Sequence, residues 1–342
     1  MSARREFCTL FDSDYLIKAV AMYRSLERTC PSFHLTAFCF DELAERLVGE
    51  LGFEHLSAVP LSELEAHDAE LLSVKSDRSP VEYCWTATPA LPLFMLDTRP
   101  EIDEVTYLDA DLLFFSDPEP LFEEMGDASV LITPHRFSPE YAQNAMNGIY
   151  NVQFMTFRRD ERGLETLNWW HDRCIEWCYY RLEDGKLGDQ KYLDDWPERF
   201  EGVHVLQHKG GGLAPWNASQ YRVRQRRGTV YVDEQPLVFF HYHRVRMRKD
   251  DKHDWHPPGY HVPRSASRLV YPPYLRALDR ALEEIRAVAP EFDRGLDSAR
   301  TTRERIDDAR VRIGDTLRRR APVLEYVRHP SRTLAGGRGR AS

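Results

Sequence analysis

Apolar positions in the first hundred residues switch repeatedly between strand-like runs and helical spacing. Glu6–Phe11, Phe33–Phe40 and His55–Pro60 are short apolar runs typical of strands, and Ser13–Arg28 and Glu42–Leu51 repeat apolar residues at helical intervals. Strands joined by helices of about ten or more residues pair in parallel, with helices on both faces of the sheet. The pattern predicts an α/β fold that binds ligands at the carboxyl ends of its strands.

The rest of the chain continues this pattern up to Pro263 and then changes. We expect a helix starting near Thr88, strands over Glu104–Asp109, Val130–Thr133, Val152–Phe157 and Leu237–His241, a long helix over Leu164–Arg181 and a hairpin between residues 220 and 232. After Pro263 a helix over Pro273–Val288 is followed by sequence without a strand signal. We therefore expect two parts, residues 1–262 as the catalytic domain and 263–342 as a helical region with a basic, partly disordered tail.

The charge of the chain argues against nucleic acid as a partner and leaves contact with a membrane surface open. The 342 residues include 46 Lys and Arg against 55 Asp and Glu, a formal net charge of −9, which opposes general nucleic-acid binding. Residues 301–342 hold eleven arginines against five acidic residues. This tail is compatible with peripheral contact to anionic lipid, although a solvated terminus explains it as well. With no membrane span or secretory signal apparent, we expect a cytoplasmic protein, with any membrane contact at the inner face.

The feature with the most chemical content is a pair of carboxylates, Asp109 and Asp111, between two apolar strand segments. Burying unpaired carboxylates is costly, so a cation or strong hydrogen-bond donors are expected beside them. Two carboxylates on one side of an extended stretch can hold a hard divalent ion and leave positions for phosphate oxygens and water. Capping and turn carboxylates are the structural alternative.

Four more motifs accompany this Asp-x-Asp triplet. They are Thr9-Leu-Phe-Asp-Ser-Asp-Tyr15, Asn151-Val-Gln153, Gly188-Asp-Gln190 and Phe239-Phe-His-Tyr-His-Arg244. In this order they resemble the GT-A-fold glycosyltransferases, in particular the glycogenin and lipopolysaccharide-transferase family 8 and related bacterial nucleotide-diphospho-sugar transferases. The resemblance covers roughly residues 6 to 250. It implies a Rossmann-like, mixed but mostly parallel sheet flanked by helices, to which this chain adds a C-terminal helical extension.

The resemblance also implies roles for the matched residues. It assigns nucleotide binding to Thr9, Asp12, Tyr15 and Asp109, metal binding to Asp109, Asp111 and His241, the donor sugar to Asn151, and the reacting centre to Asp189 and Gln190. Carboxylate and imidazole ligands with open positions suit Mn²⁺ or Mg²⁺, and the histidine favours Mn²⁺. Asp189 has an alternative role as the cap of a helix that starts near Gln190.

The chain departs from the family at several positions. Gln153 and Arg244 stand where the family has glycine, and the family's Lys-Pro-Trp is absent. Three basic residues are candidates for the diphosphate contact instead, and which of them makes it is open: Arg246, Arg248 and Lys249. Three further residues are candidates for donor or acceptor sugar: His135 at a strand end, and Trp216 and Asn217 after a glycine run. A tryptophan filling the core is an equal alternative for Trp216.

These features predict a retaining, metal-dependent transferase that moves a hexose from a UDP-sugar to a surface-glycan or lipid-linked acceptor. The metal would neutralise the departing diphosphate, and Asp189 would stabilise an oxocarbenium-like anomeric centre while Gln190 orients sugar hydroxyls. A sugar-nucleotidyltransferase is the first alternative, but the chain lacks the glycine-rich, basic phosphate loop expected near the first strand. A non-catalytic protein that binds a nucleotide sugar or a glycan is the second.

Overall fold

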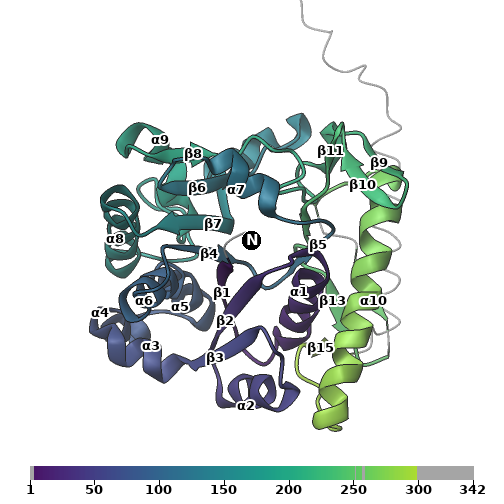
Figure 1. Cartoon of the computed structure of the whole chain (residues 1–342), viewed down its shortest axis with the longest axis horizontal. Helices are drawn as coiled ribbons and strands as arrows, with labels where there is room; N and C mark the ends of the chain where they lie inside the picture. Colours follow the sequence, from purple (N-terminus) through teal and green to yellow (C-terminus); the bar gives the residue numbers. More distant parts are fainter. Residues whose placement is uncertain (1–3, 251, 256–258, 299–342) are drawn as a thin grey trace, which may run out of the picture. The chain divides into compact units, whose positions relative to one another are not determined.

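The computed structural model describes residues 4–250, 252–255 and 259–298, and the described residues up to Asp297 form one compact unit. The predicted basic tail lies outside the described residues. Within them, the central sheet has seven strands in the order β3-β2-β1-β4-β7-β6-β8 (Figure 1). Its strands are β1 (Arg5–Phe11), β2 (Phe33–Cys39), β3 (Leu56–Pro60), β4 (Glu104–Leu108), β6 (Val130–Pro134), β7 (Tyr150–Arg158) and β8 (Val203–Val205).

Strand directions confirm the prediction of a mixed, mostly parallel sheet. Strands β3, β2, β1 and β4 run parallel, β7 is antiparallel to both β4 and β6, and β8 is parallel to β6. Successive residues of β1 face opposite sides: Phe7 packs with Met22 and Tyr23, whereas Cys8 packs with Phe94 and Met95. Each face of the sheet is therefore covered by its own set of helices.

Helices flank the sheet on both sides (Figure 1). One group holds α1 (Leu16–Thr29), α2 (Glu42–Leu51) and α10 (Arg264–Val288); the other holds α3 (Leu61–His67), α4 (Ala69–Val74), α5 (Pro80–Ala87), α6 (Ala90–Thr98) and α8 (Glu161–Glu176). Two short helices, α7 (Glu119–Met125) and α9 (Trp196–Arg199), and four 3₁₀ segments, Lys75–Asp77, Pro139–Asn147, Gln190–Asp195 and Ala218–Gln220, complete the described helical structure. No described helix has both the length and the apolar composition needed to cross a membrane.

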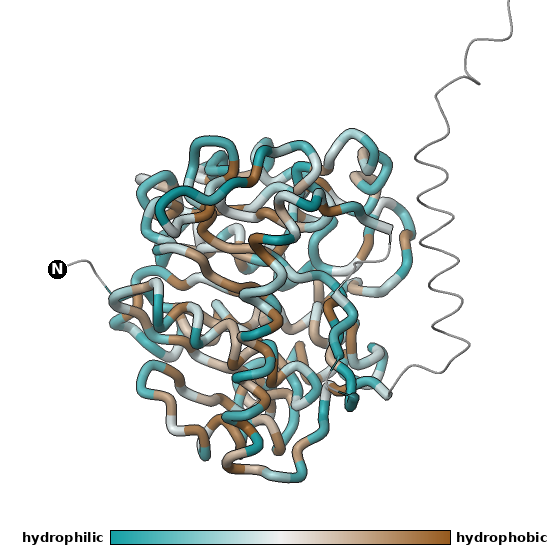
Figure 2. Tube along the Cα trace, turned by 90° about the vertical axis from the view of Figure 1, so that its right-hand side faces the viewer, coloured by the Kyte–Doolittle hydropathy of each residue, from teal (hydrophilic) through white to brown (hydrophobic). Residues whose placement is uncertain are grey.

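The other described strands form three small sheets of two or three strands each. They are β5 (Leu112–Phe114) with β12 (Phe239–His241), the hairpin β9 (Val223–Arg226) and β10 (Thr229–Val232) with β11 (Gln235–Pro236), and β13 (Arg246–Arg248) with β14 (His253–Asp254) and β15 (Leu296–Asp297). In the hydropathy trace, brown residues recur along strands and helices, and teal residues gather in the loops at the edges (Figure 2).

Local sequence signals explain several helix ends. The side chain of Asp41 accepts a hydrogen bond from the Ala44 amide at the start of α2, and Gly52 ends that helix in the left-handed conformation. Ser79 and Glu82 form a reciprocal capping box at the start of α5. Polar caps at the expected spacing thus fix these helices independently of packing.

Two predicted helices differ from the structure, and one helix was not predicted. The helix predicted to start near Thr88 is α6, which follows Pro89, but α5 just before it was not predicted. The helix predicted over Leu164–Arg181 ends at Glu176. Helix α10 begins before its predicted start at Pro273, because Val270 and Tyr271 are buried and keep the segment ahead of the prolines in the core. It packs along α1, so the helix that follows the expected boundary at residue 263 shares a core with the residues before it.

Candidate active site at the carboxyl edge of the sheet

Three predicted metal ligands lie together. Their ligand atoms are all within 4.8 Å of one another, although Asp109 and Asp111 follow β4 and His241 ends β12. His241 Nε2 lies 3.0 Å from Asp111 Oδ1 and 3.9 Å from Asp109 Oδ2. The pairing of β12 with β5 causes this proximity, because it places His241 opposite Leu112 in the strand register.

Gln153 and Tyr107 hold two of these ligands in place. His241 Nδ1 donates a hydrogen bond of 2.7 Å to Gln153 Oε1, which turns Nε2 toward the two carboxylates. The Tyr107 hydroxyl donates to Asp109 Oδ1 at 3.0 Å. Two carboxylates and an imidazole oriented by a second residue fit a divalent ion such as Mn²⁺ or Mg²⁺, as the resemblance implies.

The electrostatics of these residues reflect close packing of charges. Burial raises the pKa of the Asp109 carboxyl to about 6, against the opposing effect of His241. Burial also acts to raise the pKa of Asp111, but the adjacent His241 outweighs it and holds this pKa well below its usual range. Burial lowers and Asp111 raises the pKa of His241, and the net effect is a raised value. The raised pKa of His241 and the lowered pKa of Asp111 thus reflect their mutual attraction at a position where a divalent cation would fit.

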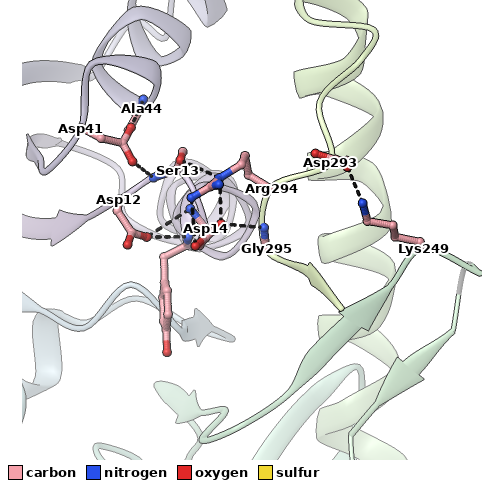
Figure 3. Close-up of polar contacts among 10 residues, drawn as sticks. Asp12, Ser13, Asp14, Asp41, Ala44, Lys249, Asp293, Arg294 and Gly295 are labelled. Carbon is pink, nitrogen blue, oxygen red and sulfur yellow. Dashed lines mark hydrogen bonds and ion pairs between the residues drawn. The ribbon is translucent and has the colours of Figure 1, made fainter. Parts of the chain in front are cut away.

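The predicted nucleotide-binding turn, Asp12–Tyr15, follows β1 at the same edge of the sheet. Asp12 Oδ1 accepts hydrogen bonds from the amides of Asp14 and Tyr15, and the Ser13 amide donates to Asp41 Oδ2 at 2.8 Å (Figure 3). The Tyr15 side chain is 45% exposed, so its ring is available for stacking. Thr9, the other residue predicted to bind the nucleotide here, is fully buried in β1. Its hydroxyl has no partner among the described residues.

Lys18, one helical turn beyond Tyr15, adds a positive charge that sequence analysis does not identify. Its Nζ lies 3.9 Å from the centre of the Tyr15 ring, and no carboxylate of the described residues pairs with it. Burial lowers the pKa of Lys18, and the charge of Asp111 acts in the opposite direction. The i, i+3 spacing from Tyr15 on α1 is a signal that could have found it.

The three basic residues predicted for the diphosphate are occupied by acidic partners. Arg246 pairs with Asp297 at 3.2 Å, and Arg248 and Lys249 pair with Asp254 and Asp293. Arg246 is the most exposed of the three, with 63% of its side chain accessible. A diphosphate contact by any of them remains a prediction, and each would share its charge between the diphosphate and an acidic partner.

Asp189 and Gln190 stand between the sheet edge and α8. The Asp189 side chain is 4% exposed, Oδ2 has no partner among the described residues, and it makes no capping hydrogen bond to the helical segment after it. Burial, and then the charge of Asp109, raise the pKa of Asp189 to about 7. Gln190 Nε2 donates to the backbone oxygen of Asn147 at 3.1 Å. Asp189 thus occupies the N-cap position of the segment Gln190–Asp195 without a capping hydrogen bond from its side chain, and its catalytic role stays a prediction.

The predicted sugar-binding residues form a buried layer against His241. Asn151 Nδ2 lies 3.0 Å from His135 Nε2, and burial lowers the pKa of His135 to about 3. The Trp216 ring, 4% exposed, meets the rings of His135 and His241 edge-on at centroid distances of 5.4 and 5.2 Å. Contact with a sugar stays a prediction for Asn151, His135 and Trp216.

Asn217 has a different role in the structure. It is fully buried, its Nδ2 donates to the backbone oxygens of His135 and Gly212, and its Oδ1 accepts from the Ala214 amide. The side chain therefore holds the glycine-rich loop, and contact with a sugar stays a prediction for Asn217 as well. Gly210 is required in that loop because a Cβ there would lie 1.8 Å from Pro236 O.

Buried polar atoms without partners in the described chain occur in several parts of the fold, and four of them lie in this region. These four are His135 Nδ1, Gln153 Nε2, Asp189 Oδ2 and Trp216 Nε1. Each carries an uncompensated desolvation cost. They offer hydrogen-bonding capacity to a polar ligand beside Asp109, Asp111 and His241.

Two known proteins are similar to the chain in sequence over most of its length. No family model matches. YfnD of Bacillus subtilis is 34% identical over 296 residues, covering 85% of this chain and 94% of YfnD, and YfnF of the same organism is 31% identical over 295 residues, covering 84% and 96%. Both are described as uncharacterized.

A solved structure is similar in fold. The galactosyltransferase LgtC, crystallised with donor and acceptor sugar analogs, matches 82% of this chain and 95% of its own with a TM-score of 0.52 at 14% identity. The strand order, the helices on both faces and this match confirm the GT-A fold. The chain belongs to the same protein family as YfnD and YfnF of Bacillus subtilis.

Proposed function

We propose that the protein is a metal-dependent glycosyltransferase that transfers a hexose from a UDP-sugar to a surface-glycan or lipid-linked acceptor with retention of configuration. The observation that carries this proposal is the convergence of Asp109, Asp111 and His241 next to the buried carboxylate of Asp189, whose Oδ2 has no partner among the described residues. The GT-A fold supports it, because LgtC, a galactosyltransferase, shares that fold.

The donor nucleotide is assigned to the turn after β1. The exposed ring of Tyr15 offers a stacking surface for uracil, and the amides of the turn are already ordered by Asp12 and Asp41. The diphosphate then extends toward Asp109 and Asp111, with Lys18 as a cation that has no carboxylate partner among the described residues. Lys18 is therefore a candidate to replace the missing Lys-Pro-Trp segment of the related transferases.

The reaction breaks the bond between the anomeric carbon and the diphosphate, whose oxygen keeps the electron pair. The acceptor oxygen bonds to the anomeric carbon and its proton passes to the departing diphosphate. Asp109, Asp111 and His241 Nε2 would hold a divalent ion, which when bound would supply charge neutralisation for the leaving group. Gln153 keeps the His241 ring in its orientation, and an ionised Asp189 stabilises the positive charge that develops at the anomeric centre.

The acceptor is assigned to a cavity of about 320 Å³ beside His243. Its wall combines aromatic rings from Tyr141 and Tyr260 with the polar side chains of Gln143 and Asn144. Tyr260 also meets the Trp216 ring at a centroid distance of 6.2 Å, which connects this cavity to the metal ligands. Aromatic faces flanked by amides fit a sugar with several hydroxyl groups.

Metal-dependent release of UDP from a panel of UDP-sugars tests the proposal. The purified protein is expected to release UDP with Mn²⁺ or Mg²⁺ and to stop with EDTA. Asp111→Asn should abolish release, and Asp127→Asn, an exposed carboxylate outside the site, should leave it unchanged. Metal-dependent UDP binding without release from any donor would identify a binding protein instead. Release of pyrophosphate from a nucleoside triphosphate and a sugar phosphate would identify a nucleotidyltransferase.

A further inference from the structure

The segment after α10 returns to the predicted nucleotide-binding turn. Arg294 Nε lies 2.9 Å from Asp14 Oδ1, and Arg294 Nη2 donates to Asp14 Oδ2 at 3.2 Å (Figure 3). The Gly295 amide donates to Asp14 Oδ1 at 3.1 Å, and Arg294 also reaches the Ser13 hydroxyl at 3.3 Å. Residues about 280 positions apart in the sequence are thereby joined at the turn between Asp12 and Tyr15.

Backbone contact reinforces this junction. Gly295 has a φ of +72°, and a Cβ at this position would lie 2.1 Å from the backbone oxygen of Asp14. No other residue type fits there without moving the turn or the segment. The sequence thus provides a glycine where the two chain segments meet most closely.

The other side of the segment is attached to β13. Leu296–Asp297 forms β15 in parallel with Arg246–Arg248, and the Lys249 amide donates to Asp297 O at 3.0 Å. Arg246 pairs with the Asp297 carboxylate. Lys249 Nζ pairs with the carboxylate of Asp293 (Figure 3). The segment Asp293–Asp297, which we call the strap, therefore joins the turn to the basic strand.

We propose that the strap holds the turn Asp12–Tyr15 in its donor-binding conformation and that Arg294 is a positioning residue for the donor nucleotide. This inference rests on the proposed function, because it assigns the donor to that turn. Arg294 acts through Asp14 and does not touch the donor. Its side chain and that of Asp14 are about half exposed, 51% and 49%, so their ion pair orders a local turn and adds little to global stability.

Two measurements on the full chain test the strap separately from the function. Hydrogen exchange of the amides in residues 12–17 should be faster in Arg294→Ala than in the wild type, without ligand. The dissociation constant for UDP with Mn²⁺ should rise about five-fold, since an exposed ion pair contributes up to about that factor. Arg294→Lys should recover part of the loss, and Arg280→Ala, an exposed arginine on α10, should match the wild type in both measurements.

The reciprocal variant makes the test stricter. Asp14→Ala should weaken UDP binding by a similar factor, and the double variant Asp14→Ala with Arg294→Ala should be no weaker than either single variant, because both remove the same contact. The donor KM should rise in each variant with kcat nearly unchanged.

The outcomes separate the two proposals. Unchanged exchange in Arg294→Ala overturns the strap whether or not UDP binds. Faster exchange with unchanged UDP affinity shows that the strap orders the turn but does not position the donor, which overturns the role of Arg294. A wild-type protein that binds no uridine nucleotide contradicts the proposed function, and the same result removes the donor role proposed for Arg294.

Discussion

Replacing Gln153 tests whether the orientation of His241 matters for metal binding. Gln153 is fully buried, and its Oε1 accepts the 2.7 Å hydrogen bond from His241 Nδ1. Methionine has a similar length and is a poor acceptor, so Gln153→Met removes the hydrogen bond with little change in volume. The ring of His241 then loses the contact that directs Nε2 toward Asp109 and Asp111.

The expected loss is large enough to measure. Removing a residue that orients a metal-binding histidine typically weakens the metal by about 10- to 100-fold, or about 1.4 to 2.8 kcal/mol. The variant also leaves the buried Nδ1 donor without a partner, which costs about 1 to 3 kcal/mol of stability in the metal-free protein. Metal affinity and metal-free stability should therefore fall together in Gln153→Met.

Titration calorimetry with Mn²⁺ at saturating UDP provides the assay. Gln153→Glu keeps an acceptor for Nδ1 and should bind Mn²⁺ within about three-fold of the wild type. Thr156→Val, which removes the buried hydrogen bond between Thr156 and Thr106 in the same sheet, should lower stability without changing Mn²⁺ affinity. Wild-type affinity in Gln153→Met would refute the reasoning, because His241 would then be oriented by another contact or would not bind the metal.

Two more predictions concern charges that contact the site or the core. Lys18→Gln should weaken UDP binding about ten-fold but leave uridine binding unchanged, measured with Mn²⁺, because only the diphosphate meets the ammonium; equal losses for both ligands would contradict this role. The second prediction concerns the pair of His171 and Asp68, in which His171 Nε2 lies 2.6 Å from Asp68 Oδ2. Burial lowers the pKa of His171 and raises that of Asp68, but the attraction within the pair outweighs burial, so the net pKa of His171 is raised and that of Asp68 is lowered. The stabilisation from this pair, about 1.5 to 3 kcal/mol, should be complete between about pH 4 and 6.5, and should fall as pH rises through the raised pKa or drops through the lowered one. The melting-temperature difference between wild type and Asp68→Asn should follow this window, and a difference independent of pH would contradict it.

The alternation of strands and helices was predictable because each element carries its own periodicity. The capped helix Glu42–Leu51 was predicted with its observed ends, since Asp41 and Gly52 mark them locally. Helix α10 was predicted too short, because two prolines usually begin a helix and here lie inside one. That exception depends on buried Val270 and Tyr271, whose packing is a property of the folded chain.

In the candidate site, too, some residues were predictable from local sequence and others were not. Asp109 and Asp111 are marked by their spacing after an apolar strand, and His241 by its motif. The hydrogen bond from His241 to Gln153 spans 88 positions, and the contact of Arg294 with Asp14 spans 280. Neither has a local pattern, because each depends on which strands become neighbours. The loop-holding hydrogen bonds of Asn217 were not predictable either, since their acceptors are backbone oxygens whose positions depend on the folded loop.

The most direct test of the central claim is the melting temperature of the purified protein with UDP in Mn²⁺, Mg²⁺ or EDTA. Ligand at about one hundred times its dissociation constant stabilises the native state by about 2.7 kcal/mol, which gives a clear shift. We predict that UDP and one UDP-sugar raise the melting temperature with Mn²⁺ or Mg²⁺ and have no effect with EDTA. An equal shift in EDTA, or no shift with any uridine nucleotide in the presence of metal, would contradict a metal-dependent UDP-sugar site at Asp109, Asp111 and His241.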